Sequence, residues 1–235
     1  MSPLFSNYFY NNYKLAIILI FSLMFLTSFT KSFARSSSEI YPWTLWKKES
    51  STAIYYRKVP DSDLIEIEAK VRLTSSLSGF LFFLQDTDNI PNWLDNAKKS
   101  KILDIIDANN LIFKTKFYGF WPIKSREMII KSRQWQNDDL SIEILIENAL
   151  NYPASDNTIL VDVISAHWLI TPNSEKEINV TYTFIVDAKG SLPMWLVNRV
   201  ALKSIWKTLV NIKDQLPHSR WQSSKLELIK EMNEK

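Results

Sequence analysis

The sequence predicts an α+β fold in which a curved antiparallel β-sheet is closed by one long C-terminal helix. Three observations support this prediction. Several segments carry hydrophobic residues at every second position, short polar turns join these segments, and one long segment, 191–216, has a helical hydrophobic period. Consecutive strands joined by tight turns pair as antiparallel meanders, and a single amphipathic helix becomes stable when its apolar side packs on the sheet.

Residues 1–34 have the composition of a signal peptide for export. A positive charge at Lys14 precedes an apolar core over 15–29, and the small residues Ser32 and Ala34 stand where signal peptidase prefers them, which predicts cleavage after Ala34. The apolar core of about 15 residues is shorter than the ~20 needed to span a bilayer. An uncleaved N-terminal membrane anchor is the alternative interpretation.

Cysteine is absent from the chain, so no lipidated cysteine anchors the protein. A chain without disulfides suits the bacterial periplasm better than a harsher exterior. We therefore expect a periplasmic or secreted protein.

The mature chain is expected to consist of a short leader (35–40), one domain (41–216) and a polar C-terminal tail (217–235). The whole chain has 28 basic and 25 acidic side chains, and removal of the signal peptide takes away Lys14 and Lys31. The net charge is then close to zero, which argues against a nucleic-acid-binding protein. A domain of this length buries a sizeable core.

The first predicted elements are a short helix and a hairpin. Residues 41–48 are expected to form a helix in which Trp43 and Trp46, three positions apart, share a face. Segments 52–59 and 64–73 are predicted strands, and the second alternates hydrophobic and charged residues as a half-buried antiparallel strand does. The sequence PDSD between them has the chemistry of a hairpin turn.

The hydrophobic period changes after residue 75, where two short helices are predicted over 77–86 and 91–97. Strands follow, most of them separated by short polar turns. Their predicted ranges are 101–107, 111–119, 126–136, 140–148, 159–170 and 178–186.

The final helix is predicted to begin at Ser191, whose hydroxyl can cap it, with Pro193 in the first turn, where a missing N–H costs little. One side of this helix is polar. The other side carries Met194, Val197, Ala201, Leu202, Ile205, Leu209, Ile212 and Leu216. Asn198 falls near the middle of the apolar side. Because a buried amide needs partners, Asn198 either bonds the backbone of a neighbouring element or faces a cavity that holds something polar.

A sheet closed by one helix leaves space that side chains do not easily fill, so an apolar hollow between the two is expected. Pockets of this kind have apolar walls and a few polar groups that orient the ligand. Core packing is the default role of the apolar helix residues, and under the cavity hypothesis some of them line the hollow instead. The candidate ligand-binding residues are Asn198, Met194, Ala201, Ile205, Leu209 and, on a strand, His167.

The chain resembles the StAR-related lipid-transfer (START) domains, specifically their bacterial members, over most of 40–216. The resemblance rests on WPIKSRE (121–127) and on 167–198, where a Trp-containing strand ends in Thr-Pro and a later strand leads through Gly190 to Pro193, Trp195 and Asn198. The chain has DAKG where the family often has Asp-Pro-Gly-Gly. The resemblance implies a helix-grip fold, an internal cavity for one lipid or sterol-like molecule, and binding or transfer without catalysis.

The residues themselves offer little for catalysis. The two histidines, His167 and His218, lie far apart in the sequence, and there is no metal-binding HExxH or HxH spacing, no GxSxG elbow and no glycine-rich phosphate loop. We therefore expect no metal, no cofactor and no enzymatic activity. The alternatives are a cyclase- or hydrolase-like enzyme that uses His167 with an acid in the same hollow, or a protein-binding module whose hollow is filled.

A monomer is expected, with transient membrane contact as a further expectation. Aromatic residues of the two short helices could dip into a bilayer if they were exposed, although core packing is the better prediction for them. These residues are Phe80, Phe82, Phe83 and Trp93.

Overall fold

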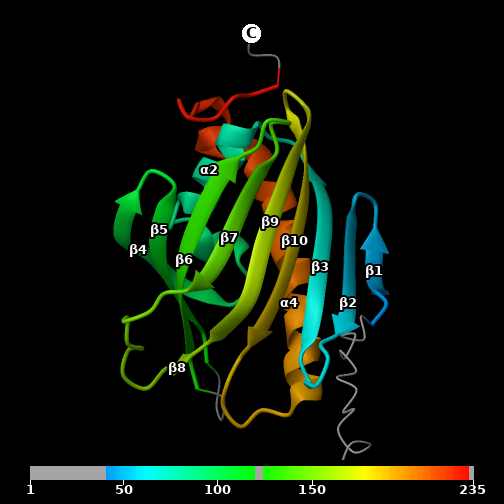
Figure 1. Cartoon of the computed structure of the whole chain (residues 1–235), viewed down its shortest axis with the longest axis vertical. Coiled ribbons are helices and arrows are strands. Elements are labelled where there is room, and N and C mark those ends of the chain that lie inside the picture. Colours follow the sequence, from blue (N-terminus) through cyan, green and yellow to red (C-terminus); the bar gives the residue numbers. More distant parts are fainter. Residues whose placement is uncertain (1–40, 120–123, 233–235) are drawn as a thin grey trace, which may run out of the picture. The chain divides into compact units, whose positions relative to one another are not determined.

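The computed structural model describes residues 41–119 and 124–232; the predicted signal peptide (1–34) and leader (35–40) lie outside this range. In the described part, ten strands form one sheet (Figure 1) with the order β1-β2-β3-β10-β9-β7-β6-β5-β4, and β8 pairs with β6. Every pair is antiparallel except β6 with β8. The strands are β1 (Thr44–Glu49), β2 (Thr52–Lys58), β3 (Ile65–Leu73), β4 (Ala97–Asp107), β5 (Asn110–Phe117), β6 (Arg126–Gln136), β7 (Ile142–Asn148), β8 (Ile159–Leu160), β9 (Asp162–Ser174) and β10 (Glu177–Asp187).

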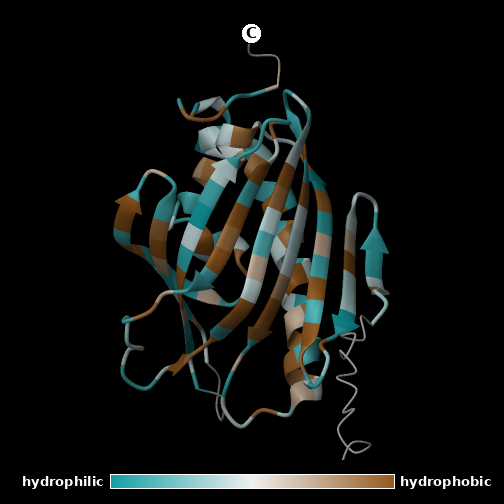
Figure 2. Ribbon diagram, in the orientation of Figure 1, coloured by the Kyte–Doolittle hydropathy of each residue, from teal (hydrophilic) through white to brown (hydrophobic). Residues whose placement is uncertain are grey.

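The predicted α+β class, with its antiparallel sheet and one long C-terminal helix, is confirmed. Helix α4 (Met194–Gln215) runs along one face of the sheet, and Figure 1 shows it behind β10 and β3. We call this face the inner face. The strands alternate hydrophobic and hydrophilic residues along their length (Figure 2), as strands do when one face is buried. None of the helices in the described ranges is long and apolar enough to cross a membrane.

The predicted helix over 41–48 is wrong, since β1 occupies most of this range. The pairing of β1 with β2 shifts register between Leu45 and Lys47. Such a bulge disturbs the two-residue period of a strand, which is why the spacing of Trp43 and Trp46 looks helical. Trp46 packs edge-on against Trp206 of α4, with ring centroids 6.4 Å apart.

The two short helices form, with shorter bounds than predicted: α2 (Leu77–Gln85) and α3 (Ile90–Trp93). The Ser76 hydroxyl caps α2 by accepting the Gly79 N–H at 3.0 Å. Helix α3 ends early because the chain turns at Asn96, which has a left-handed φ of 61°, and β4 then begins at Ala97.

Ser191 does not cap α4, contrary to prediction. Pro193 occupies the N-cap position, without a side-chain hydrogen bond, and the helix begins at Met194. The apolar side of α4 is the predicted one. Its central and C-terminal residues Leu202, Ile205, Leu209 and Ile212 are buried against the sheet.

The segment after α4 packs on α2. It contains two 3₁₀ turns, Leu216–His218 and Arg220–Ser223. The Trp221 ring stacks on Phe82 at 5.2 Å between centroids. The Glu231 carboxylate accepts the N–H groups of Leu77 and Ser78, at 3.0 and 2.8 Å. The residues predicted to form a polar tail therefore hold the first turn of α2.

One buried ion pair fastens the loop between β7 and β8 to the sheet. The Glu127 side chain is 1% exposed, lies 3.0 Å from the Lys114 ammonium and accepts the Ser155 N–H at 2.7 Å. Burial by itself raises the pKa of Glu127, but the hydrogen bonds from Ser155 and the charge of Lys114 outweigh burial and hold that pKa below its ordinary value.

We expect Glu127→Gln to lower the free energy of unfolding near neutral pH by about 2–4 kcal/mol, because it leaves a partly buried Lys114 without its counter-ion. The Glu127 pKa is lowered in the folded state. Its contribution is therefore complete above the ordinary glutamate pKa and is lost as pH falls through the folded-state value.

Urea unfolding curves near neutral pH and at about pH 3 measure this effect, and the difference between the two proteins should shrink in acid. Glu49→Gln, at an exposed position, is the matched control and should leave stability unchanged. Equal stability of Glu127→Gln and the wild type at neutral pH would contradict the prediction.

Candidate functional site

An internal cavity of about 150 Å³ lies between the inner face of the sheet and the helices α2, α3 and α4. Strands β5, β6, β7, β9 and β10 form its floor. The helices contribute its roof, with Leu81, Leu84 and Gln85 on α2, Ile90 and Trp93 on α3, and Ile205 and Thr208 on α4.

Strand alternation aims the floor residues at the cavity. On β6 every second residue lines it: Met128, Ile130, Ser132 and Gln134. The other floor residues are Phe113, Thr115, Ile144, Ile146, Trp168 and Tyr182. The rings of Trp168 and Tyr182 stack with centroids 4.1 Å apart, so two aromatic faces from adjacent strands form one rigid part of the floor.

The polar groups in the cavity wall are uncharged near neutral pH. Gln85 donates to Gln134 at 3.2 Å, and the Thr208 hydroxyl accepts the Asp95 N–H at 3.1 Å. Burial raises the pKa of Tyr182, which keeps its hydroxyl protonated. No Asp, Glu, His, Lys or Arg is found among the lining residues that the structure describes.

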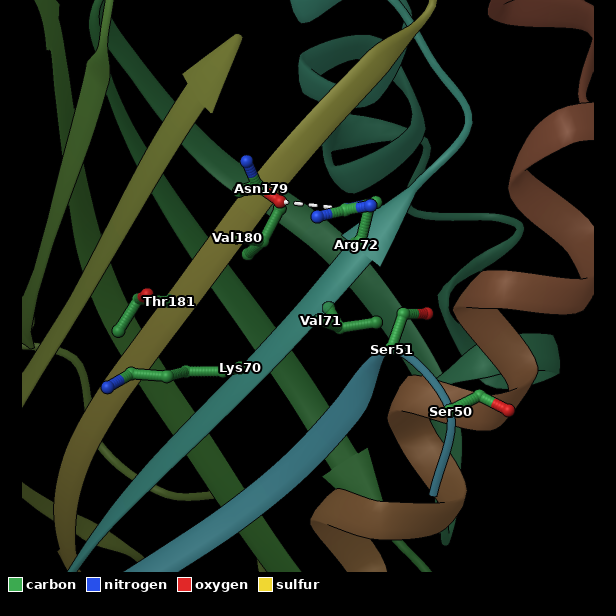
Figure 3. Close-up of a pocket in the computed structure, with 8 residues that line it drawn as sticks. All are labelled: Ser50, Ser51, Lys70, Val71, Arg72, Asn179, Val180 and Thr181. Carbon is green, nitrogen blue, oxygen red and sulfur yellow. Dashed lines mark hydrogen bonds between the residues drawn. The ribbon is translucent and has the colours of Figure 1, made fainter. Parts of the chain in front are cut away.

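A second hollow, of about 510 Å³, lies at the β1–β2 turn, β3 and β10. Figure 3 shows its eight lining residues, with Arg72 donating to Asn179 at 3.4 Å. Lys70 in the same wall pairs with Glu68 at 2.7 Å. Both charged side chains of this wall thus have polar partners, Lys70 in Glu68 and Arg72 in Asn179. The internal cavity, by contrast, has the apolar walls expected of a ligand site.

Comparison with known proteins agrees with this architecture. The START domain model matches residues 32–221. The chain belongs to the START domain family. Among curated relatives, an uncharacterised Pseudomonas aeruginosa protein is 21% identical over 172 residues, which cover 73% of this chain and 85% of that protein. Human START domain-containing protein 10 is 23% identical over 210 residues, covering 80% of this chain and 69% of the human protein.

Solved START structures share the fold. The STAR-related lipid transfer protein of Xanthomonas axonopodis (fragment 25–204) superposes with a TM-score of 0.65 at 23% identity, covering 74% of this chain and 98% of that one. Human StAR-related lipid transfer protein 5 gives a TM-score of 0.66 at 13% identity, with coverage of 75% and 86%. The predicted helix-grip fold and its START resemblance are confirmed.

The four apolar residues of α4 that were predicted to bind the ligand do not all line the cavity. Ile205 lines the cavity. Leu209 is buried in the adjoining core, and Ala201 packs on that core while partly exposed. Met194 is half-buried at the first turn of α4. The two polar residues that were predicted to bind the ligand, Asn198 and His167, are both absent from the cavity lining.

Asn198 follows the first of its two predicted alternatives. Its side-chain amide donates to the backbone carbonyl of Asp63, in the turn between β2 and β3, at 3.1 Å. The first turns of α4 reach this hairpin turn, so an amide on the apolar side meets a backbone acceptor there.

The prediction that His167 lines the cavity is wrong. His167 lies on the outer face of β9, 39% exposed, and its Nε2 is 2.9 Å from the Glu143 carboxylate. Since neighbouring residues of a strand face opposite sides, the inward position belongs to Trp168. This placement also removes His167 from the cyclase- or hydrolase-like alternative.

Sequence reasoning missed the polar residues of the floor and of the short helices. Ser132 and Gln134 continue the alternation of Met128 and Ile130, so the two-residue period of β6 carried a usable signal. Gln85 and Trp93 gave none, because both lie at the ends of short helices.

We expect Asn198→Ala to lower the free energy of unfolding by about 0.5–1.5 kcal/mol, the value of one hydrogen bond to the Asp63 carbonyl, and to leave any bound lipid in place. Urea unfolding and lipid extraction from the purified variant measure the two effects. Asn211→Ala is the comparison. It removes a similar hydrogen bond, from the Asn211 amide to the Trp93 carbonyl, but at a helix that lines the cavity. Loss of lipid in Asn198→Ala alone would restore Asn198 as a ligand contact.

Proposed function

We propose that this START domain protein binds one hydrophobic molecule in its internal cavity without chemically changing it, and carries that molecule between membranes. The observation that supports this proposal is the cavity itself. Its walls come from five strands and three helices, and they are apolar with a few neutral polar groups. Removal of apolar ligand surface from water supplies the binding energy, at roughly 25 cal/mol per Å² before ordering costs.

Relatives support the class of ligand. The Xanthomonas axonopodis structure is of a STAR-related lipid transfer protein, as is the human structure compared above. An acid–base mechanism requires converging titratable groups, whereas the polar groups of the described lining are neutral amides, hydroxyls and two indoles. We therefore favour a carrier over an enzyme.

Entry of a lipid requires the roof to move, because 150 Å³ is below the roughly 300–1,000 Å³ of ordinary ligand pockets. Helix α3 is the element that we assign to this movement. It is held to α4 by the side chains of Asn211 and Gln215, which donate to the carbonyls of Trp93 and Asn92 at 3.1 and 2.9 Å. Hydrogen bonds of this kind break and re-form at modest cost.

We also propose that the protein is exported, with cleavage after Ala34, and acts in the periplasm or outside the cell. A carrier suits an aqueous compartment between membranes, where a free lipid is poorly soluble. Transient contact with a membrane surface, by a monomer, completes the transfer.

Ser132→Phe tests the cavity directly, because it places an aromatic ring in the hollow from the β6 floor. We expect lipid extracted from the purified protein, measured per mole by mass spectrometry, to fall about tenfold or more while circular dichroism shows an intact fold. Ser165→Phe makes the same substitution at an exposed position on β9 and should keep the lipid. Wild-type protein that is consistently empty, and that takes up no lipid from a panel, would contradict the proposed function.

A further inference from the structure

The indole N–H of Trp93 is a buried hydrogen-bond donor without an acceptor. The Trp93 side chain lines the cavity and is 5% exposed, and its Nε1 is the buried side-chain nitrogen or oxygen that lacks a partner within the described ranges. Buried donors in native proteins almost always have partners, since an unpaired one costs free energy. The exception therefore requires an explanation.

The surroundings of Trp93 are otherwise fully engaged. Its carbonyl accepts from Asn211, and its ring packs on Phe83 with centroids 5.7 Å apart. The next residues are also bonded: the Asp95 N–H donates to Thr208, and the Asp95 carboxylate pairs with Lys207 at 2.7 Å. The roof thus satisfies its neighbouring polar groups and leaves one donor unpaired, on a residue that lines the hollow.

The rest of the wall narrows the ligand's chemistry. The lining residues described above include no formal charge, and a buried ion without a counter-charge is strongly disfavoured. A carboxylate, phosphate or ammonium group inside this cavity would have no counter-ion. A neutral oxygen would have a donor in Trp93 and further amide and hydroxyl groups in Gln85, Gln134 and Ser132.

We propose that the ligand is an uncharged lipid carrying a hydroxyl, carbonyl or ester oxygen, and that this oxygen accepts a hydrogen bond from Nε1–H of Trp93. This inference rests on the proposed function. It adds that Trp93 selects the ligand class. A ligand without an acceptor leaves the buried N–H unpaired, and this discriminates between ligands more strongly than an apolar wall does. The ligand oxygen lies under α3, and the hydrocarbon part lies over the aromatic and aliphatic floor.

A competition among three matched probes tests the proposal. The purified protein is incubated at alkaline pH with an equimolar mixture of tetradecan-1-ol, tetradecane and tetradecanoate, re-isolated, and its bound molecules are quantified by gas chromatography and mass spectrometry. The three share one chain and differ in having a neutral oxygen, no oxygen or a charge. We expect the alcohol to be retained about three- to tenfold over the alkane, and the carboxylate to be retained least.

Trp93→Phe keeps an aromatic ring and removes the N–H. The smaller ring affects alcohol and alkane alike, so the ratio between them isolates the hydrogen bond, as in a double-mutant cycle. We expect this ratio to fall to about one in Trp93→Phe. Trp135→Phe is the matched control. Trp135 lies on β6 next to the inward-facing Gln134 and therefore points to the outer face of the sheet, so its substitution should leave the ratio unchanged.

The outcomes separate this inference from the proposed function. An unchanged ratio in Trp93→Phe, or preferential retention of tetradecanoate, overturns the ligand class while lipid binding stands. Retention of none of the three probes, by a protein that also fails to take up other lipids, overturns both. A ratio that falls equally in Trp135→Phe assigns the effect to general loosening of the fold and overturns the role of Trp93.

Discussion

The structure depends on how one helix packs against a sheet much wider than itself. Helix α4 contacts β2 and β3, at one side of the inner face, and buries Leu202, Ile205, Leu209 and Ile212 there. It cannot also cover β5, β6 and β7, because a helix with its side chains is only about 10–12 Å wide, roughly the width of two to three strands. The short helices α2 and α3 roof that half instead. The cavity lies where α4 meets the short helices α2 and α3. It therefore follows from the difference in width between the one long helix and the sheet.

Regular periodicity allowed most of the fold to be predicted from the sequence. Strand β6 has its predicted bounds, and the apolar side of α4 is the predicted one, since repeated periods average out single exceptions. The errors lie where one residue changes the local geometry. A bulge between Leu45 and Lys47 disturbed the period of β1, so this strand was predicted as a helix, and Pro193 takes the N-cap position that was predicted for Ser191. A helical wheel also shows which side Asn198 is on, but not that the helix reaches the β2–β3 turn at this point.

The candidate site was harder to predict, because its polar residues come from short or distant elements. The helical period of α4 identified Ile205 but says nothing of the floor, where the alternation of each strand decides which residues face inward. The same rule that places Trp168 inside places His167 outside, so the large apolar ring of Trp168 was a usable signal against an inward His167. Trp93 carried no such signal. Its position depends on α3 being ended by Asn96 and on bonds from α4 residues more than a hundred positions away.

The two roof helices are held in different ways, and this difference suits a carrier. Helix α2 buries Leu77, Phe80, Leu81 and Phe83, and the C-terminal segment fastens its first turn through Glu231. Helix α3 is a single turn held to α4 by side-chain hydrogen bonds. Opening at α3 therefore exposes less apolar surface and costs less than opening at α2. Because Trp93 lies on α3, a ligand oxygen that satisfies its N–H stabilises the closed roof directly. On the proposed mechanism, the element that must move for entry is then also the one that responds to the ligand's chemistry.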